Sequence, residues 1–384
     1  MKLIRFLSIL FFVSFFVCYM PKVNANNLDN IQSEIYNEQF NISGIEKLWK
    51  YIPKEQTKQL DNIGIKKGNW KEISNLNLSN IFNEIFKVIS EKSKSPFKSL
   101  LPVISIMIVS MIFNGIKPQI NKNSTEHILN AISTLCICIY VIKPIVSLIN
   151  ASSLTIKSAS NFILCYVPIM SAIMIASGQA ISATSYHTLV LSAGKIISHV
   201  SEKFILPFMS IVLGISIISS LSPNFKLEYI CKSIHKSTKT ILKFISSIFT
   251  SILALQNLVS SSADSLGANV LKSTAKSCVP VIGVMISGTF DTIYGSLKLL
   301  KAGVGAFGII VGGFIFLPII IECILWIVFI NISEYIGNVL EIKNISVLLK
   351  SLSNVVSTII SILIFSMIIL IISSGIVIMI GGNK

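Results

Sequence analysis

The feature that most constrains this sequence is a series of long apolar runs that contain almost no charge. Six runs are strongly apolar: 99–117, 128–149, 161–178, 204–222, 303–331 and 353–381. Most approach or exceed the roughly 20 residues that an α-helix needs to cross the hydrocarbon of a bilayer. Two weaker runs, 180–200 and 244–262, are interrupted by polar and charged side chains. The pattern predicts a helical bundle that crosses a membrane several times.

The composition favours the same class of protein. Hydrophobic residues make up 52% of the 384 residues and charged residues only 13%, about half the charged fraction of a typical soluble domain. A soluble core cannot bury such an excess of apolar side chains, whereas lipid can surround it. We therefore expect an all-α fold, that of a polytopic helical protein in the cell membrane.

The N-terminus has the three-part pattern of a secretory signal peptide. Lys2 and Arg5 precede an apolar stretch over 7–17, and residues 23–25 match the small-residue pattern of a cleavage site. We expect residues 1–25 to be a cleaved signal peptide, with an uncleaved anchor as the alternative. Both interpretations export the segment that follows.

Residues 26–98 form a more polar segment before the first strongly apolar run. They include 11 lysines and 9 acids, and two stretches have apolar residues every three or four positions. Such spacing is typical of amphipathic helices. We expect a small extracytoplasmic helical segment in which Trp49, Tyr51 and Trp70 form a little core or contact the membrane surface. Its few apolar residues favour docking onto a partner or onto the membrane face.

The basic stretch 223–243 sets the expected orientation. It carries five lysines and one glutamate, and lysines gather on the cytoplasmic side of a membrane. Because the N-terminal segment is exported, an odd number of crossings must precede residue 223. Only four strong runs precede it, so we expect 180–200 to be a fifth crossing. The alternative is that one strong run, such as 128–149, is re-entrant.

These arguments divide the chain after the signal peptide into five parts. The first is the extracytoplasmic segment 26–98, and the others are a first membrane bundle over 99–222, a basic cytoplasmic loop over 223–243, a weak span with a re-entrant or interfacial segment over 244–302, and a C-terminal transmembrane hairpin over 303–384.

Four lysines of the basic loop share one side of a predicted helix. Lys232, Lys236, Lys239 and Lys243 are spaced at i, i+4, i+7 and i+11, which brings them onto one helical face. Anionic lipid headgroups are one partner that this pattern predicts. An acidic cytoplasmic partner, such as an energy-supplying ATPase, is the alternative.

Ionisable residues surround a short apolar run at 279–290. The run has 12 residues, about 18 Å of helix, which is too short to span. Four charged residues near it are candidate pathway or packing residues: Asp264, Asp291, Lys298 and Lys301. Since a charge at membrane depth costs roughly 3 kcal/mol or more, such residues pair or line a water-filled path. One interpretation is a re-entrant or broken helix with Asp291 paired to Lys298 or Lys301; the other is an interfacial helix with these charges in water.

Three further candidate residues lie within the run 303–331. Glu322 is an acid at a depth where acids are usually buried in the bundle and often functional, with a lipid-edge position as the alternative. Gly308 and Gly312 have the spacing that allows two helices to approach closely.

No pattern typical of catalysis or metal binding occurs in the sequence. It contains no phosphate-binding glycine loop of the Walker type and no HExxH or GxSxG motif. We interpret the six cysteines after the signal peptide as small apolar side chains: Cys136, Cys138, Cys165, Cys231, Cys278 and Cys323. The lysines are not interleaved with aromatic residues, which argues against nucleic-acid binding. We expect no enzymatic activity, no cofactor, no metal and no nucleic-acid partner.

The stretch from "SSADSL" through "VPVIGVMISGTFDTIYGS" to "KAGVGAFG", followed by a long proline-containing span, resembles the stage III sporulation protein AE family. Residues 279–308 carry the most specific part of the likeness. The resemblance implies a mother-cell membrane protein of endospore-forming bacteria. It would act in the channel or secretion-like complex between mother cell and engulfed forespore, with other membrane and ring-forming subunits and a cytoplasmic ATPase as partners. The family supplies no catalytic residues.

We therefore expect an integral scaffold or export-gate component of a transenvelope channel that is needed for forespore development. A self-sufficient permease or secondary transporter for a small solute is the alternative. Inverted repeats would favour a transporter, and the two halves of the sequence show no convincing internal repeat.

Overall fold

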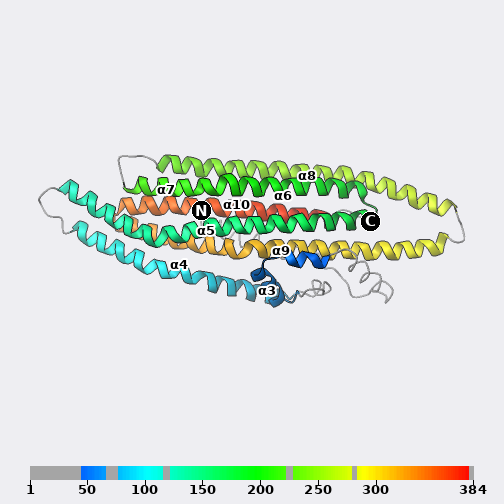
Figure 1. Cartoon of the computed structure of the whole chain (residues 1–384), viewed down its shortest axis with the longest axis horizontal. Coiled ribbons are helices and arrows are strands. Elements are labelled where there is room, and N and C mark those ends of the chain that lie inside the picture. Colours follow the sequence, from blue (N-terminus) through cyan, green and yellow to red (C-terminus); the bar gives the residue numbers. More distant parts are fainter. Residues whose placement is uncertain (1–44, 66–76, 116–121, 222–227, 279–282, 380–384) are drawn as a thin grey trace.

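The computed structural model describes residues 45–65, 77–115, 122–221, 228–278 and 283–379, so the expected signal peptide and Trp70 lie outside the described residues. The long helices run side by side along the long axis of the molecule (Figure 1). The elements, in chain order, are η1 (Ile45–Tyr51), α3 (Lys54–Asn62), α4 (Leu78–Gly115), α5 (Lys122–Ala176), α6 (Ala180–Val200), η3 (Ser201–Ile205), α7 (Leu206–Leu221), α8 (Glu228–Cys278), α9 (Gly283–Val339) and α10 (Lys343–Met379). The described residues form no strand, which confirms the all-α prediction.

Within the described residues, six helical stretches are long and apolar enough to cross a membrane. They are Leu78–Phe113, Ile128–Ala176, Ala180–Leu221, Tyr229–Leu255, Gly295–Val339 and Lys343–Ile378. The chain is therefore a multi-pass helical membrane protein, as its composition predicts.

The hairpin of α9 and α10 forms the centre of the bundle. The most apolar windows of these two helices have mean hydropathies of 2.7 and 3.0, and 56% and 61% of their residues are buried inside the bundle. The corresponding shares are only 22% in α4 and 11% in α8. Large side chains of α9, including Phe307, Phe316 and Trp326, are fully buried. The peripheral helices therefore leave most of their apolar surface for lipid or for other proteins.

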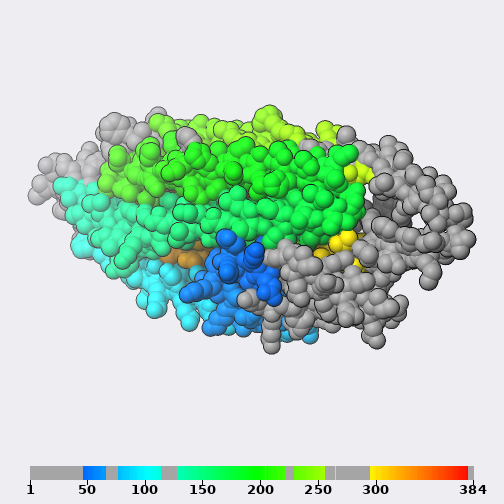
Figure 2. Space-filling view, turned by 45° about the vertical axis from the view of Figure 1, so that its right-hand side comes forward, coloured from blue at the N-terminus to red at the C-terminus, as the bar shows by residue number. Residues whose placement is uncertain are grey.

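Residues 45–65 of the N-terminal segment pack against this bundle. Leu48 and Leu60 are fully buried, and the ring of Trp49 lies 5.7 Å from that of Phe307 in α9, centroid to centroid. Tyr51, by contrast, is 44% exposed. Figure 2 shows the segment, in blue, against the side of the bundle. Since α5 and α9 bury this segment, its small number of apolar residues is sufficient.

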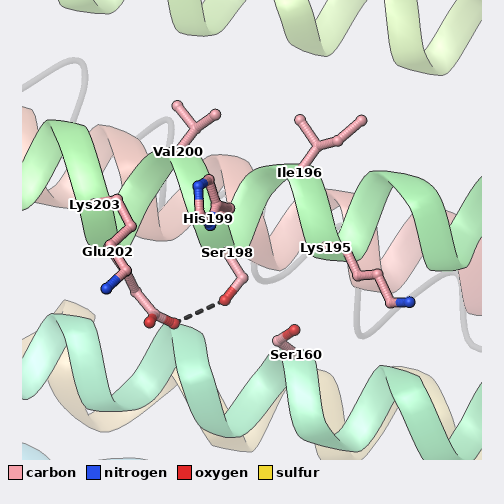
Figure 3. A pocket seen from close by; sticks show the side chains of 8 residues that line it. All are labelled: Ser160, Lys195, Ile196, Ser198, His199, Val200, Glu202 and Lys203. Carbon is pink, nitrogen blue, oxygen red and sulfur yellow. Dashed lines mark hydrogen bonds between the residues drawn. The ribbon is translucent and has the colours of Figure 1, made fainter.

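The two halves of the Ala180–Leu221 helix join without a loop. The N–H of Leu206 bonds to the carbonyl of Ser201, five residues earlier, so η3 is one wide π-helical turn between α6 and α7. Figure 3 shows the part of α6 and η3 that precedes α7. The runs 180–200 and 204–222 therefore belong to one helical path and not to two crossings.

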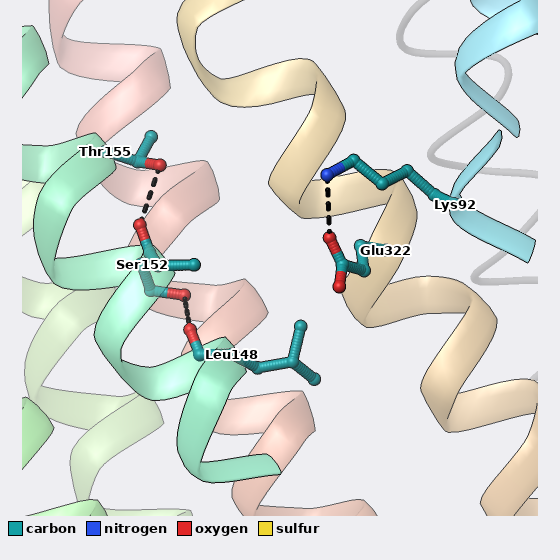
Figure 4. A network of polar contacts seen from close by, with 6 residues as sticks. Lys92, Leu148, Ser152, Thr155 and Glu322 are labelled. Atoms are coloured by element: carbon teal, nitrogen blue, oxygen red, sulfur yellow. Dashed lines mark hydrogen bonds and ion pairs between the residues drawn. The ribbon is translucent and has the colours of Figure 1, made fainter. Parts of the chain in front are cut away.

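Helix α5 likewise contains two of the apolar runs, 128–149 and 161–178, almost entirely within its 55 residues. The polar stretch between them is helical, and its hydroxyls bond to carbonyls four residues earlier in the same helix. Ser152 donates to Leu148 (2.6 Å) and Thr155 to Ala151 (2.9 Å) (Figure 4). The expected five runs before residue 223 therefore join into fewer helices, and the number of crossings stays a prediction. Three long helical paths precede residue 222 in the described structure, which is also an odd number.

Three of the expected boundaries also fall inside helices: 98/99 in α4, 243/244 in α8 and 302/303 in α9. Helix α8 begins at Glu228, so most of the predicted basic loop is helical. Helix α9 continues from Gly283 through residue 302 to Val339, so residues 283–290 are its first turns and not a separate re-entrant or interfacial helix. The sequence after residue 290 contains no proline until Pro318, and nothing local ends the helix after its short apolar run.

Candidate functional site

Asp264, from α8, lies at the N-terminus of α6. Its carboxylate accepts hydrogen bonds from the backbone N–H groups of Ile181 (3.0 Å) and Ser182 (2.9 Å). The first amides of a helix have no partner within their own helix, and the helix dipole stabilises a negative charge there. Asp264 is buried, and it therefore caps a helix that begins more than 80 residues earlier in the chain.

The turn between α5 and α6 needs this external support because it is very short. The N–H of Gly178 bonds to the carbonyl of Ile175, and the N–H of Gln179 bonds to that of Met174, each at 2.9 Å. This is the Schellman pattern, in which the residue after the helix adopts the left-handed conformation that favours glycine. Gly178 has a φ of 75° accordingly.

Lys301, from α9, reaches the same turn. Its ammonium donates to the side-chain oxygen of Gln179 at 3.0 Å, and only 3% of Lys301 is exposed. Gln179 is itself buried and occupies the N-cap position of α6. We call Asp264, Gln179 and Lys301 the turn cluster. Through it, α8 and α9 both hold the connection between α5 and α6.

The side chain of Asp291 lies outside the described residues, so its predicted pairing with Lys298 or Lys301 stays a prediction. Lys298 is exposed, whereas Lys301 contacts Gln179. Gln179 could not be identified as a partner from the sequence, because an uncharged residue 122 positions away gives no local signal.

Glu322 forms an ion pair with Lys92 of α4 at 3.1 Å (Figure 4). The side chains are 24% and 32% exposed, so the acid lies at an edge of the bundle beside a cation. Sequence reasoning missed Lys92 because it assigned residues 26–98 to an extracytoplasmic segment. The signal was the helical periodicity of "LSNIFNEIFKVISEK", which continues into the apolar run that follows.

The two glycines of α9 contact two different helices. A Cβ at Gly308 would lie 2.5 Å from the ring and hydroxyl of Tyr166 in α5, and a Cβ at Gly312 would overlap Leu370 in α10. The Tyr166 hydroxyl donates to the carbonyl of Val304 in α9 at 3.4 Å. The small residues thus allow α9 to approach α5 on one side and α10 on another.

The lysines of α8 do not all face outward. Lys239 donates to Ser357 of α10 at 2.8 Å, and the neighbouring His235 ring bonds to Thr358. Lys232, Lys236 and Lys243 are exposed, and the ammonium of Lys232 lies 5.7 Å from the centre of the Tyr229 ring, a cation–π distance. The predicted four-lysine surface is therefore a three-lysine surface, and Lys239 joins α8 to α10.

Within the described residues, no group of three histidine, cysteine, aspartate or glutamate side chains could hold a metal ion. The cysteines described there are all free thiols: Cys136, Cys138, Cys165, Cys231 and Cys323. The polar contacts above join helices that are distant in sequence, and their chemistry is that of hydrogen bonds and ion pairs which fix the arrangement of the bundle.

Comparison with known proteins identifies the family. The family model of stage III sporulation protein AE matches residues 61–381. This chain belongs to that family. The matched range contains the whole turn cluster and both members of the Lys92–Glu322 pair, so the contacts described above lie within the stage III sporulation protein AE region.

A curated relative, the stage III sporulation protein AE of Bacillus subtilis (strain 168), is 21% identical over 232 residues. The aligned part covers 60% of this chain and 57% of that relative, which is less than two thirds of its length. No solved structure matches the chain significantly. As a member of the stage III sporulation protein AE family with six apolar helical spans, the chain is a multi-pass membrane protein with a role in sporulation.

Proposed function

We propose that this chain is an integral membrane scaffold or export-gate component of a channel complex that links mother cell and forespore. In this proposal it lies in the mother-cell membrane around the forespore and is needed for forespore development. The observation that carries the proposal is the match to the stage III sporulation protein AE family across residues 61–381.

The contacts between helices support a scaffold role. In lipid, the hydrophobic effect does not favour contact between two helices over contact with lipid tails. Close packing and polar contacts therefore determine which helices associate. Here Asp264 joins α8 to α6, Lys301 joins α9 to the α5–α6 turn, and Lys92 joins α4 to Glu322 of α9. Such a bundle keeps its shape while other subunits bind around it.

The outer helices supply surfaces for such subunits. Large apolar side chains of α4 and α8 are exposed: Phe86, Phe97 and Leu101 in α4, and Tyr229, Ile241, Phe244 and Leu255 in α8. In the proposed complex these faces contact other membrane subunits as well as lipid. The three-lysine surface at the start of α8 would bind either anionic headgroups or an acidic cytoplasmic ATPase.

Deletion and complementation in a spore-forming host that carries this chain test the proposal. We expect deletion to arrest forespores after engulfment and to lower heat-resistant spore counts, with both restored by the wild-type chain. Normal spores accompanied by a defect in uptake of a small nutrient would reject the channel role and favour a stand-alone transporter.

Purification from sporulating cells tests the partners separately. Extraction in mild detergent should recover the chain together with ring-forming subunits and the ATPase. The variant Lys232→Gln/Lys236→Gln/Lys243→Gln should lose the ATPase selectively if the three-lysine surface binds it; retention of the ATPase would assign that surface to lipid. Recovery of the chain with no other subunit would contradict the proposed complex.

A further inference from the structure

A wide-open cavity of about 640 Å³ lies along the end of α6 and η3, with Ser160 of α5 as the one lining residue from another helix (Figure 3). Its polar lining comes from Ser160 of α5 and from Lys195, Ser198, His199, Glu202 and Lys203 of α6 and η3. These residues belong neither to the turn cluster nor to the Lys92–Glu322 pair. The cavity is therefore a separate polar feature on a helix that is otherwise apolar.

The backbone is irregular at this point. The π-helical turn η3 begins at Ser201, between the lining residues Val200 and Glu202. One backbone hydrogen bond here spans five residues, whereas those of an α-helix span four. Single π turns inside α-helices occur frequently at functional sites, because they change the direction of the side chains that follow. Here the irregular turn carries Glu202 and Lys203.

The cavity has a cationic balance. Lys195 and Lys203 are both exposed at its rim, and Glu202 is the one acid in its lining. Ser198 donates to the Glu202 carboxylate at 2.7 Å, as Figure 3 shows. This hydrogen bond holds the carboxylate of Glu202 against its own helix. Two lysines and one glutamate leave the lining with a net positive charge.

The length of the helical path allows this charge to lie at the level of a membrane surface. The Ala180–Leu221 path has 42 residues, about 63 Å, which is twice the roughly 30 Å thickness of bilayer hydrocarbon. If either half lies in hydrocarbon, residues 195–203 lie at its border. Ile196, which lines the cavity, is 59% exposed, and Ile181 and Ile211, farther along the same path, are 50% and 58% exposed.

We propose that this cavity binds the phosphate headgroup of an anionic glycerophospholipid. Lys195 and Lys203 hold the phosphate, His199 and Ser160 contribute to the polar wall, and the acyl chains lie along the exposed isoleucines. Basic pockets between transmembrane helices bind anionic headgroups in this way. The neighbouring apolar side chains favour a lipid over a soluble phosphate ester, because a soluble ester has no acyl chains to contact them.

Native mass spectrometry of the purified full-length chain, titrated with phosphatidylglycerol or phosphatidylcholine, tests this inference. The variant Lys195→Gln/Lys203→Gln should bind phosphatidylglycerol about 30-fold more weakly than the wild-type chain, since each lysine near a membrane surface contributes roughly a fivefold factor. The control Lys343→Gln/Lys350→Gln removes the same charge from exposed positions on α10 and should bind as the wild type does. Phosphatidylcholine should bind weakly to all three proteins.

A second variant makes the test independent of any folding defect in the first. Glu202→Gln removes the one acid of the lining and should strengthen phosphatidylglycerol binding roughly fivefold. Unchanged binding by the double lysine variant, weaker binding by Glu202→Gln, or equal binding of the two lipids would overturn the proposal. Displacement of the lipid by an equal concentration of glycerol 3-phosphate would assign the cavity to a soluble anion instead.

Discussion

Lys301 and Gln179 share a hydrogen bond of 3.0 Å although 122 residues separate them in the sequence. The bond joins the start of the central α9 to the short turn between α5 and α6, while Asp264 of α8 caps α6 from another direction. Four helices thus meet at one end of the bundle through buried polar groups. Burial makes each of these groups costly to leave without a partner.

A double-mutant cycle measures the Lys301–Gln179 contact. Hydrogen bonds to charged groups contribute about 1.5–3 kcal/mol, so Gln179→Leu should lower the free energy of unfolding by roughly that amount in the wild-type background. In a Lys301→Met background the same change should cost clearly less, because the bond is already absent. Thermal unfolding in detergent provides the measurement, and additive effects of the two substitutions would contradict the contact.

The helix cap at α6 gives a second prediction. Asp264→Ala removes the acceptor of two backbone N–H groups and should destabilise the bundle by about 0.5–2 kcal/mol, the usual cost of losing an N-cap. Asp61→Ala is the matched control, since Asp61 is an exposed aspartate of α3. A lowered melting temperature for both variants alike would show that Asp264 acts only through its contribution to net charge.

Two glycines of α9, Gly308 and Gly313, provide the third prediction. Gly308→Ala should destabilise the bundle by about 1–3 kcal/mol, because the new methyl group overlaps the buried Tyr166 ring. Gly313→Ala should be neutral or stabilising by up to about 1 kcal/mol, since its Cβ would meet nothing within 4 Å and alanine favours the helix. Melting temperatures that fall equally for both would mean that α9 does not approach α5 at Gly308.

The sequence predicted the fold class and the apolar runs, but it overestimated the number of separate helices. Composition and run length depend on each residue's own preference for lipid, which a sequence records directly. Whether the helix ends between two runs depends on local chemistry that hydropathy ignores. Serine and threonine side chains around Ser152 bond to carbonyls of their own helix, which continues through them. The π turn η3 likewise continues the helical path through polar residues after Lys195 without a loop.

The candidate residues were identified more reliably than their partners. Asp264 and Lys301 lie buried in the turn cluster, and Glu322 is paired, but the sequence analysis did not name the contacts that the structure shows for them. Their partners are backbone amides, an uncharged glutamine and a lysine from the N-terminal segment. Only the tertiary arrangement brings these groups together.

Reversal of the Lys92–Glu322 pair gives the fourth prediction. Both side chains are partly exposed, so the pair should contribute modestly, on the order of 1 kcal/mol. Glu322→Lys alone should destabilise the bundle through repulsion with Lys92, and the added change Lys92→Glu should restore most of the loss. The control replaces Lys87, an exposed lysine of α4 outside the pair, by glutamate. Equal rescue by Lys87→Glu would contradict the specific pairing.

The central claim is that six long helices of the described residues form one membrane bundle in which α6, η3 and α7 make a single crossing. Accessibility of single cysteines to a membrane-impermeant thiol reagent, in a background without native cysteines, tests it most directly. The exposed positions Ala176, Tyr229 and Lys343 serve as label sites. An α6–η3–α7 path that crosses the membrane once, followed by single crossings of α8 and α9, predicts that Ala176→Cys is labelled from one side of the membrane and both Tyr229→Cys and Lys343→Cys from the other. Labelling of Ala176→Cys and Tyr229→Cys from the same side would contradict it, because the chain would then cross the membrane an even number of times between these two positions.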